Sequence, residues 1–293
     1  MTSTPDHISR MNRRSFLHRA FCGAVVSLGT ARPGLHALSS AGKRISTIGL
    51  QLYTVRRELE TDFAGSLEKV AALGFREVEF AGYFKHSPQE VKSILAHYQL
   101  SSPSAHISTA ALRGNLQDEI EAARAIGHQY LVCGYLPAEE RRSLDDYKRL
   151  VELLNRAGER LKKVGIQFGY HNHDFEFAAL EGRLPYDMML AGTDPRLVKM
   201  EIDLYWIIKA GQDPIKYFSA YPGRFPLIHI KDMDATPRHF FAEVGQGTID
   251  FKKILAAARK AGVKHYFVEQ DETPASPFSS IKLSIDYLKR LEF

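Results

Sequence analysis

An alternation of amphipathic segments and short apolar runs dominates the chain from about residue 45 onwards. At four places an amphipathic stretch ends in glycine, and a short β-branched or aromatic run begins within about three residues. Glycine can take the left-handed conformation that ends a helix, and the run after it has the composition of a strand. This order of helix, glycine and strand predicts alternating α/β structure with a parallel sheet. The glycines are Gly74, Gly127, Gly165 and Gly262, followed by runs at 77–80, 130–133, 166–170 and 266–269.

Four further strand-like runs and several helical stretches fill the intervals. The runs span 47–53, 104–107, 198–203 and 227–231, and helical periodicity is clearest at 67–73, 91–98, 145–164, 251–261 and 281–291. Eight alternating units in about 250 residues are typical of a closed barrel. An open doubly wound sheet would be expected to carry a glycine-rich phosphate loop after an early strand, and the sequence has none. We therefore expect a single (β/α)8 TIM barrel over residues 43–293.

The first 42 residues differ in character from the rest of the chain. Arg13-Arg14-Ser-Phe-Leu resembles the twin-arginine export motif, and a weakly apolar stretch follows at 20–31, with small residues near 35–41. A disordered basic tail is the alternative interpretation. We expect residues 1–42 to be a twin-arginine signal peptide and linker, the export machinery to be a partner, and the protein to be periplasmic or otherwise exported.

Composition and charge narrow the classes of protein. The 293 residues are 44% hydrophobic and 25% charged, which is ordinary for a globular enzyme. Five arginines and one aspartate lie in residues 1–42, so 34 basic and 33 acidic residues remain, a net charge of +1. The net positive charge of the whole chain therefore comes mostly from residues 1–42 and does not indicate a nucleic-acid partner. No apolar run is long enough for a stable membrane span. Cys133 is the only cysteine after residue 42, so no disulfide can form within residues 43–293. The sequence leaves open whether the protein is a homo-oligomer.

Polar side chains gather where the last four predicted strands end. In barrels of this kind the catalytic residues lie at the C-terminal strand ends and in the loops that follow. Because side chains alternate along a strand, residues two apart face the same side. The pairs related in this way are His171 and His173, Glu201 and Asp203, His229 and Lys231, and Glu269 and Asp271, with Glu176 shortly after the first pair.

Four consecutive strands thus direct carboxylates and imidazoles towards one end of the barrel. Taken alone, His229 would more often be a hydrogen-bonded core histidine, and Asp203 could cap a helix or pair with a base. Four such residues in register favour one bound divalent metal ion instead. Oxygen and nitrogen ligands without thiolate suit Mn²⁺, Zn²⁺, Co²⁺ or Mg²⁺, and the sequence does not choose among them.

The motifs Tyr-His-Asn-His, Glu-Ile-Asp, His-Ile-Lys-Asp and Val-Glu-Gln-Asp resemble the sugar phosphate isomerase/epimerase family of xylose isomerase-like TIM barrels, in its inosose dehydratase-like branch. The resemblance covers residues 45–293. It implies a metal held by residues of strands five to eight, and three of these positions correspond to Asp203, His229 and Glu269. The strand-five ligand stays open between His171, His173 and Glu176, with parity favouring a histidine.

Further residues are candidates for catalysis or substrate binding. Lys231 lies two residues beyond a metal ligand on the same face, where it could stabilise an enolate. Glu243-Val-Gly-Gln-Gly resembles the loop that covers the site in relatives. For His106, Glu79 and Gln51 a structural role is as plausible as a functional one. The expected catalytic residues are Glu176, Glu269, Lys231 and His106; the expected substrate-binding residues are Gln51, Glu79, His173, Trp206 and Glu243.

A metal with open positions polarises a substrate carbonyl, and a nearby base can then remove the adjacent proton. The sequence therefore predicts a metal-dependent isomerase, epimerase or dehydratase (lyase) acting on a sugar, keto-sugar or cyclitol. An export signal favours free keto-sugars over sugar phosphates. A phosphodiesterase of AP-endonuclease type is an alternative, but Trp206 stands where such members carry a histidine, and the near-neutral charge disfavours DNA binding. A non-catalytic sugar-binding barrel is the other alternative.

Overall fold

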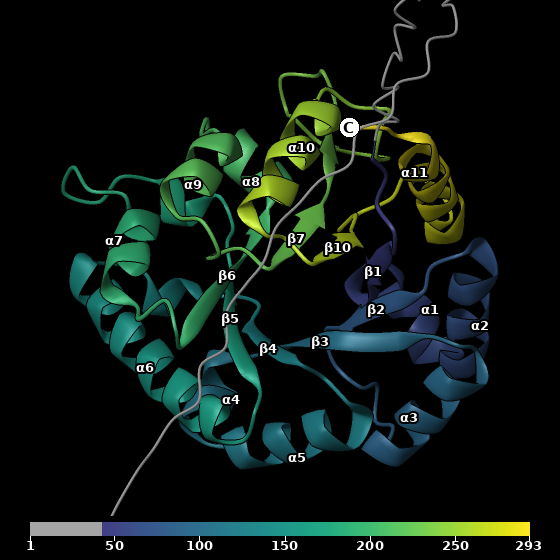
Figure 1. Ribbon diagram of the computed structural model, residues 1–293, viewed down its shortest axis with the longest axis horizontal. Helices are drawn as coiled ribbons and strands as arrows, with labels where there is room; N and C mark the ends of the chain where they lie inside the picture. The colour runs from purple at the N-terminus through teal and green to yellow at the C-terminus, as the bar shows by residue number, and fades with distance from the viewer. Residues whose placement is uncertain (1–42) are drawn as a thin grey trace, which may run out of the picture. The chain divides into compact units, whose positions relative to one another are not determined.

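The computed structural model describes residues 43–293, which form a closed barrel of eight parallel strands surrounded by helices (Figure 1). The spatial order is β1-β10-β7-β6-β5-β4-β3-β2, and β1 pairs with both β10 and β2, which closes the barrel. The predicted (β/α)8 fold is confirmed. The strands are β1 (Gly49–Gln51), β2 (Glu77–Phe80), β3 (Ser101–Ile107), β4 (Tyr130–Cys133), β5 (Gln167–His171), β6 (Val198–Asp203), β7 (Leu227–Ile230) and β10 (His265–Val268).

The helices lie outside the strands (Figure 1). They are α1 (Arg56–Thr61), α2 (Phe63–Leu73), α3 (Pro88–His97), α4 (Thr109–Arg113), α5 (Leu116–Ile126), α6 (Leu144–Lys163), α7 (Pro185–Gly192), α8 (Leu204–Lys209), α9 (Pro214–Ala220), α10 (Phe251–Ala261) and α11 (Pro277–Arg290), with short 3-10 turns η1 (Leu52–Val55), η2 (Ala138–Glu140) and η3 (Phe175–Phe177). Helix α3 begins earlier than its periodicity predicts because Ser87 and Glu90 form a capping box. The four predicted glycines have φ between 80° and 106°, as a left-handed helix end requires.

Two apolar clusters pack against the two sides of the strands. Outward-facing residues such as Ile202 and Ile230 belong to the main hydrophobic core between strands and helices. A smaller cluster contains Leu227 and Phe267, which by alternation face the same side as His229 and Glu269. Phe267 fills the space where a Cβ on Gly49 would lie, 2.5 Å from its ring. This smaller apolar cluster therefore fills the barrel interior next to the polar residues at the strand ends.

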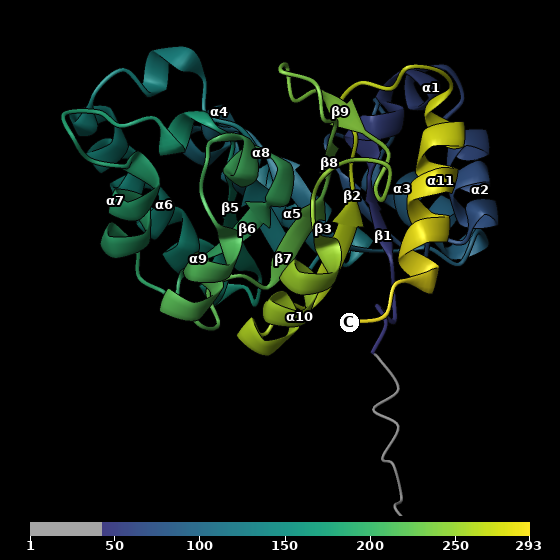
Figure 2. The ribbon, with the colours of Figure 1, turned by 90° about the horizontal axis from the view of Figure 1, so that it is seen from above.

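The strand ends pass into loops that build the upper end of the barrel in Figure 2. After β7 the chain forms a small antiparallel hairpin of β8 (Asp232–Met233) and β9 (Phe241–Ala242). None of the described helices is long and apolar enough to cross a membrane. The predicted twin-arginine signal peptide, residues 1–42, lies outside the described residues.

Candidate active site

A cavity of about 640 Å³ opens at the C-terminal ends of the strands. Its lining contains polar side chains from β3, β5 and the segments that follow β7 and β10, among them His106, His171, Lys231 and Glu269. Four parallel strands deliver these residues to one place because their carboxyl ends meet at the same rim. The cavity lies where the sequence predicted the active site.

Four buried side chains near this cavity form a group with the chemistry of a divalent-metal site. The possible ligand atoms of His171, Asp203, His229 and Glu269 all lie within 4.8 Å of one another. The Oδ2 atom of Asp203 is buried and accepts no hydrogen bond, although Lys231 Nζ lies 3.0 Å from it. Two imidazoles and two carboxylates without thiolate are a donor set for zinc, manganese or cobalt. These residues fit the predicted metal.

At the strand-five position left open by the sequence, the end of β5 favours His171. His171 is the last residue of the strand and belongs to the group, whereas His173 lies in the following loop and lines the cavity. Glu176 does not reach the cavity lining. Its carboxylate accepts hydrogen bonds from the Tyr170 hydroxyl at 2.5 Å and from the backbone N–H of His173 at 2.8 Å. Glu176 therefore anchors the loop after β5 from a position outside the cavity lining, and its catalytic role stays a prediction.

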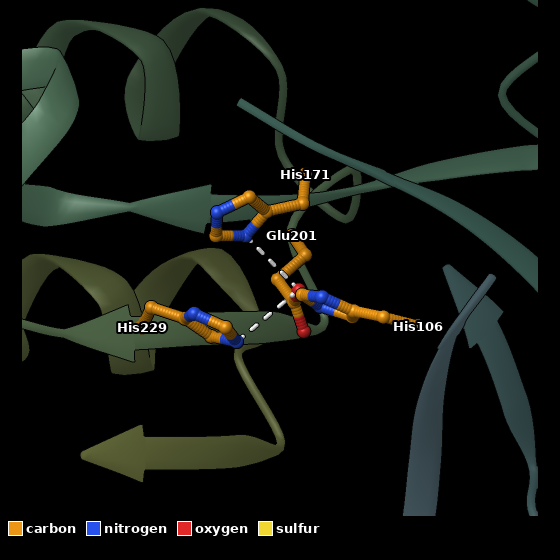
Figure 3. A group of neighbouring side chains, drawn as sticks. All are labelled: His106, His171, Glu201 and His229. Atoms are coloured by element: carbon orange, nitrogen blue, oxygen red, sulfur yellow. Dashed lines mark hydrogen bonds and ion pairs between the residues drawn. The ribbon is translucent and has the colours of Figure 1, made fainter. Parts of the chain in front are cut away.

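The Glu201 carboxylate lies among the imidazole rings of His106, His171 and His229 (Figure 3). Its Oε2 is 2.6 Å from His106 Nε2, 3.1 Å from His171 Nδ1 and 3.2 Å from His229 Nε2. Together with these three histidines Glu201 forms a second group with metal-ligand spacing. Glu201 is not among the site residues expected from the sequence, although its parity with Asp203 in Glu-Ile-Asp places both side chains on the inner face.

Two predicted substrate-binding residues lie deeper than expected. The Glu79 carboxylate is fully buried and lies 2.7 Å from His229 Nε2, and Gln51 Nε2 donates a hydrogen bond to Glu79 at 2.7 Å. Neither residue lines the cavity. The Glu79 side chain therefore contacts His229, and Gln51 contacts Glu79, so the structure places both residues behind the cavity wall and not in it.

Three carboxylates surround the buried ammonium group of Lys231. Its Nζ lies 3.0 Å from Asp203 Oδ2, 2.9 Å from Glu269 Oε2 and 2.6 Å from Asp271 Oδ1. Burial alone would lower the pKa of Lys231, but these three carboxylates raise it well above its usual value. Lys231 therefore brings a fixed positive charge to the cavity wall.

The histidines differ in their electrostatic surroundings. Burial lowers the pKa of His171 well below its usual value, and the neighbouring charge of His229 lowers it further. Burial would also lower the pKa of His106, but the charges of Glu79 and Glu201 raise it to about 10. A neutral His171 has a free nitrogen lone pair, which is the form that binds a metal.

Two of the remaining predicted residues face the cavity and one does not. His173 and Trp206 line it. Glu243 does not, because its Oε1 accepts a hydrogen bond from Ser280 Oγ of α11 at 2.8 Å. Glu243 therefore attaches the loop after β9 to α11, and its substrate contact stays a prediction.

Comparison with known proteins shows the family to which this fold belongs. The sequence profile described as xylose isomerase-like TIM barrel matches residues 67–291. Inosose dehydratase of Lacticaseibacillus casei is 26% identical over 273 residues, which cover 78% of this chain and 89% of that protein.

Solved structures show the same fold. A sugar phosphate isomerase/epimerase from Parabacteroides distasonis superimposes with a TM-score of 0.73 at 27% identity, covering 87% of this chain and 98% of that one. The IolI protein, solved with a zinc atom, has a TM-score of 0.66 at 15% identity over 84% of this chain and 99% of its own.

Proposed function

Because the chain belongs to the xylose isomerase-like TIM barrel family, we propose that it is a divalent-metal-dependent lyase or isomerase of a keto-sugar or cyclitol. The observation that carries the proposal is the buried group of His171, Asp203, His229 and Glu269 beside a cavity of about 640 Å³. The inosose dehydratases among its relatives favour loss of water from the substrate over a simple shift of a proton.

The four residues of this group would hold the metal. A divalent cation bound there supplies positive charge that polarises a carbonyl or hydroxyl oxygen of the substrate. The zinc atom of the IolI protein supports a metal in a barrel of this shape. Two imidazoles and two carboxylates leave the identity of the cation open.

The residues of the chain supply the proton chemistry. Glu269 lines the cavity and is the carboxylate placed to accept the proton next to the carbonyl. Lys231 Nζ, 2.9 Å from Glu269 Oε2, stabilises negative charge that develops on the substrate oxygen. His173 and Trp206 line the cavity and would orient the sugar ring. Trp206 offers no metal ligand, which weighs against the phosphodiesterase alternative.

Deuterium exchange tests this function. Metal-loaded protein is incubated in D₂O with inososes and free keto-hexoses, and we expect deuterium to enter the carbon next to the carbonyl. Glu269→Gln should slow exchange about 10²- to 10⁴-fold, the usual contribution of a general base. The proposal would be wrong if the protein bound no divalent metal and if deuterium exchange were absent or unaffected by chelation.

We also propose export of the protein through the twin-arginine pathway, which rests on the motif around Arg13 and Arg14. Fractionation of cells that express the full chain should place the protein outside the cytoplasm. The Arg13→Lys, Arg14→Lys double variant should stay inside. Equal distribution of both proteins would contradict export by this route.

A further inference from the structure

The cavity has more room than one sugar ring beside the predicted metal group would fill. Its volume of about 640 Å³ falls within the range of pockets that enclose drug-sized ligands, larger than one sugar ring. The inner part carries the side chains of the metal group. The outer part, called here the outer wall, is lined by Tyr53, Tyr135, Arg141 and Phe175.

Planar groups in the outer wall hold one another in place. The guanidinium carbon of Arg141 lies 3.3 Å from the ring centroid of Phe175. Phe175 in turn stacks on His173, with centroids 5.2 Å apart and an angle of 5° between the rings. Tyr135 stands edge-on to both rings, at 5.9 Å from Phe175 and 5.2 Å from His173. The wall therefore runs as one assembled surface from the mouth to the predicted substrate residue His173.

Two tyrosines expose their rings at this cavity. Tyr53 is 41% exposed and Tyr135 is 49% exposed, and within residues 43–293 only Val164 and Leu283 are comparable large hydrophobic residues. An exposed aromatic ring gains stability when an apolar face covers it. The outer wall thus offers a surface for a ligand that has such a face.

The polar groups of the outer wall include both donors and acceptors. Arg141 Nη2 donates to the Tyr135 hydroxyl at 3.3 Å, and the guanidinium forms no ion pair with any residue of the described range. Asp174 lines the same cavity and presents a carboxylate. A sugar hydroxyl can both donate and accept, so it satisfies both groups. A phosphate or carboxylate would meet Arg141 favourably but would be repelled by Asp174.

We propose that the outer wall is a subsite for a second, neutral sugar ring attached to the ring that reacts. The inference rests on the proposed function, because the reacting ring must occupy the inner part beside the metal group. It narrows the substrate class to a keto-glycoside or a glycosylated cyclitol. The apolar face of the second ring covers Tyr135, and its hydroxyls bond to Arg141 and Asp174.

Binding calorimetry with metal-loaded protein tests the subsite. The probes are one-ring ligands (glucose, myo-inositol), their neutral two-ring extensions (maltose, galactinol) and their anionic forms (glucose 6-phosphate, myo-inositol 1-phosphate). We expect at least one two-ring ligand to bind about three- to tenfold more tightly than its one-ring parent, the gain of one or two stacking contacts. Tyr135→Ala and Arg141→Met should remove this gain and leave one-ring binding unchanged.

The control is Leu283→Ala on α11, because Leu283 is 50% exposed but does not line the cavity. This variant should keep the two-ring preference. If one-ring ligands bind but neither extension binds more tightly, or if the phosphates bind best, the subsite is wrong and the proposed function stands. If no probe binds, the result counts against the proposed function and the subsite together.

Discussion

The two ring nitrogens of His171, and likewise those of His229, face different carboxylates. His171 presents Nδ1 to Glu201 at 3.1 Å and Nε2 towards Asp203 Oδ2 at 3.8 Å. His229 presents Nε2 to Glu201 at 3.2 Å and Nδ1 to Glu269 at 2.7 Å. A histidine that binds a metal through one nitrogen usually donates its other N–H to a carboxylate, which fixes the ring. Glu201 is placed to orient His171, and it shares the orientation of His229 with Glu79, which lies 2.7 Å from His229 Nε2.

Replacement of Glu201 tests this arrangement without relying on catalysis. We expect Glu201→Gln to weaken zinc binding about 10- to 100-fold, as loss of such an orienting partner does. Competition with a chelating dye measures the affinity, and the metal content of the wild type should be one ion per chain.

The matched control for this replacement is Glu77→Gln. Glu77 pairs with His265 at 2.9 Å, and both residues lie at the first positions of their strands, away from the cavity. Its affinity for zinc should equal that of the wild type. Unchanged affinity in Glu201→Gln, or two ions per wild-type chain, would show that Glu201 does not act as proposed.

Glu176 makes protein stability depend on pH. Burial raises its pKa to about 7 from 4.5, although the hydrogen bonds from Tyr170 and His173 oppose the shift. The folded state therefore binds this proton more tightly than the unfolded state, and the contribution of Glu176 to stability is lost as pH rises from 4.5 through 7.

Glu176→Gln should remove this dependence because an amide does not ionise in this range. Relative to the wild type, the free energy of unfolding of the variant should rise by about 3 kcal/mol between pH 4.5 and 7.5. Urea unfolding at four pH values in this range, with chelator present, measures the difference. A difference between the two proteins that is constant with pH would contradict the assignment.

At the scale of elements, the segment after β7 depends on one aspartate. Asp232 is buried and accepts hydrogen bonds from four backbone N–H groups, with donors at Met233, Gly245, Gly247 and Ile249. A Cβ on Gly247 would lie 2.3 Å from Asp232 Oδ1, so the backbone must approach the carboxylate closely. This carboxylate therefore attaches residues 245–249 to the start of β8.

Asp232→Asn should therefore loosen this loop. We expect the free energy of unfolding to fall by about 2–3 kcal/mol, because the carboxylate accepts charge-assisted hydrogen bonds that one amide oxygen cannot replace. Hydrogen exchange at Gly245 and Gly247 should accelerate. Asp234→Asn is the control, because the partly exposed Asp234 carboxylate bonds to Thr236 and Phe240 within the loop and not to residues 245–249. This variant should lower the free energy of unfolding by less than about 1 kcal/mol. Equal effects of the two variants would refute the anchoring role.

At the scale of the whole molecule, metal binding should stabilise the barrel, because four strands contribute the ligands. Free zinc at 100 times its Kd should add about 2.7 kcal/mol to the free energy of unfolding. For a chain of this size the Tm should rise by about 5–10 °C. Calorimetry with and without chelator measures the shift, and Asp203→Asn should reduce it. No shift with zinc, manganese, cobalt or magnesium would count against a metal at this site.

The sequence by itself determined the barrel and much of its chemistry. Helix-ending glycines and strand-like runs predicted all eight barrel strands, because such local signals depend on residues close in the chain. Alternation along the strands placed His171, Asp203, His229 and Glu269 on one inner face, and the structure brings their ligand atoms within 4.8 Å.

Only the tertiary structure decided how far each strand reaches and where loop side chains point. Glu176 and Glu243 follow strands in the sequence, yet each is held by a neighbour, Tyr170 or Ser280, away from the cavity. Tyr135 and Arg141 reach the mouth from the irregular segment after β4, where no periodicity predicts direction. Local pattern specifies which face of a strand a residue occupies, whereas loop directions and the depth of a side chain depend on contacts between residues distant in sequence.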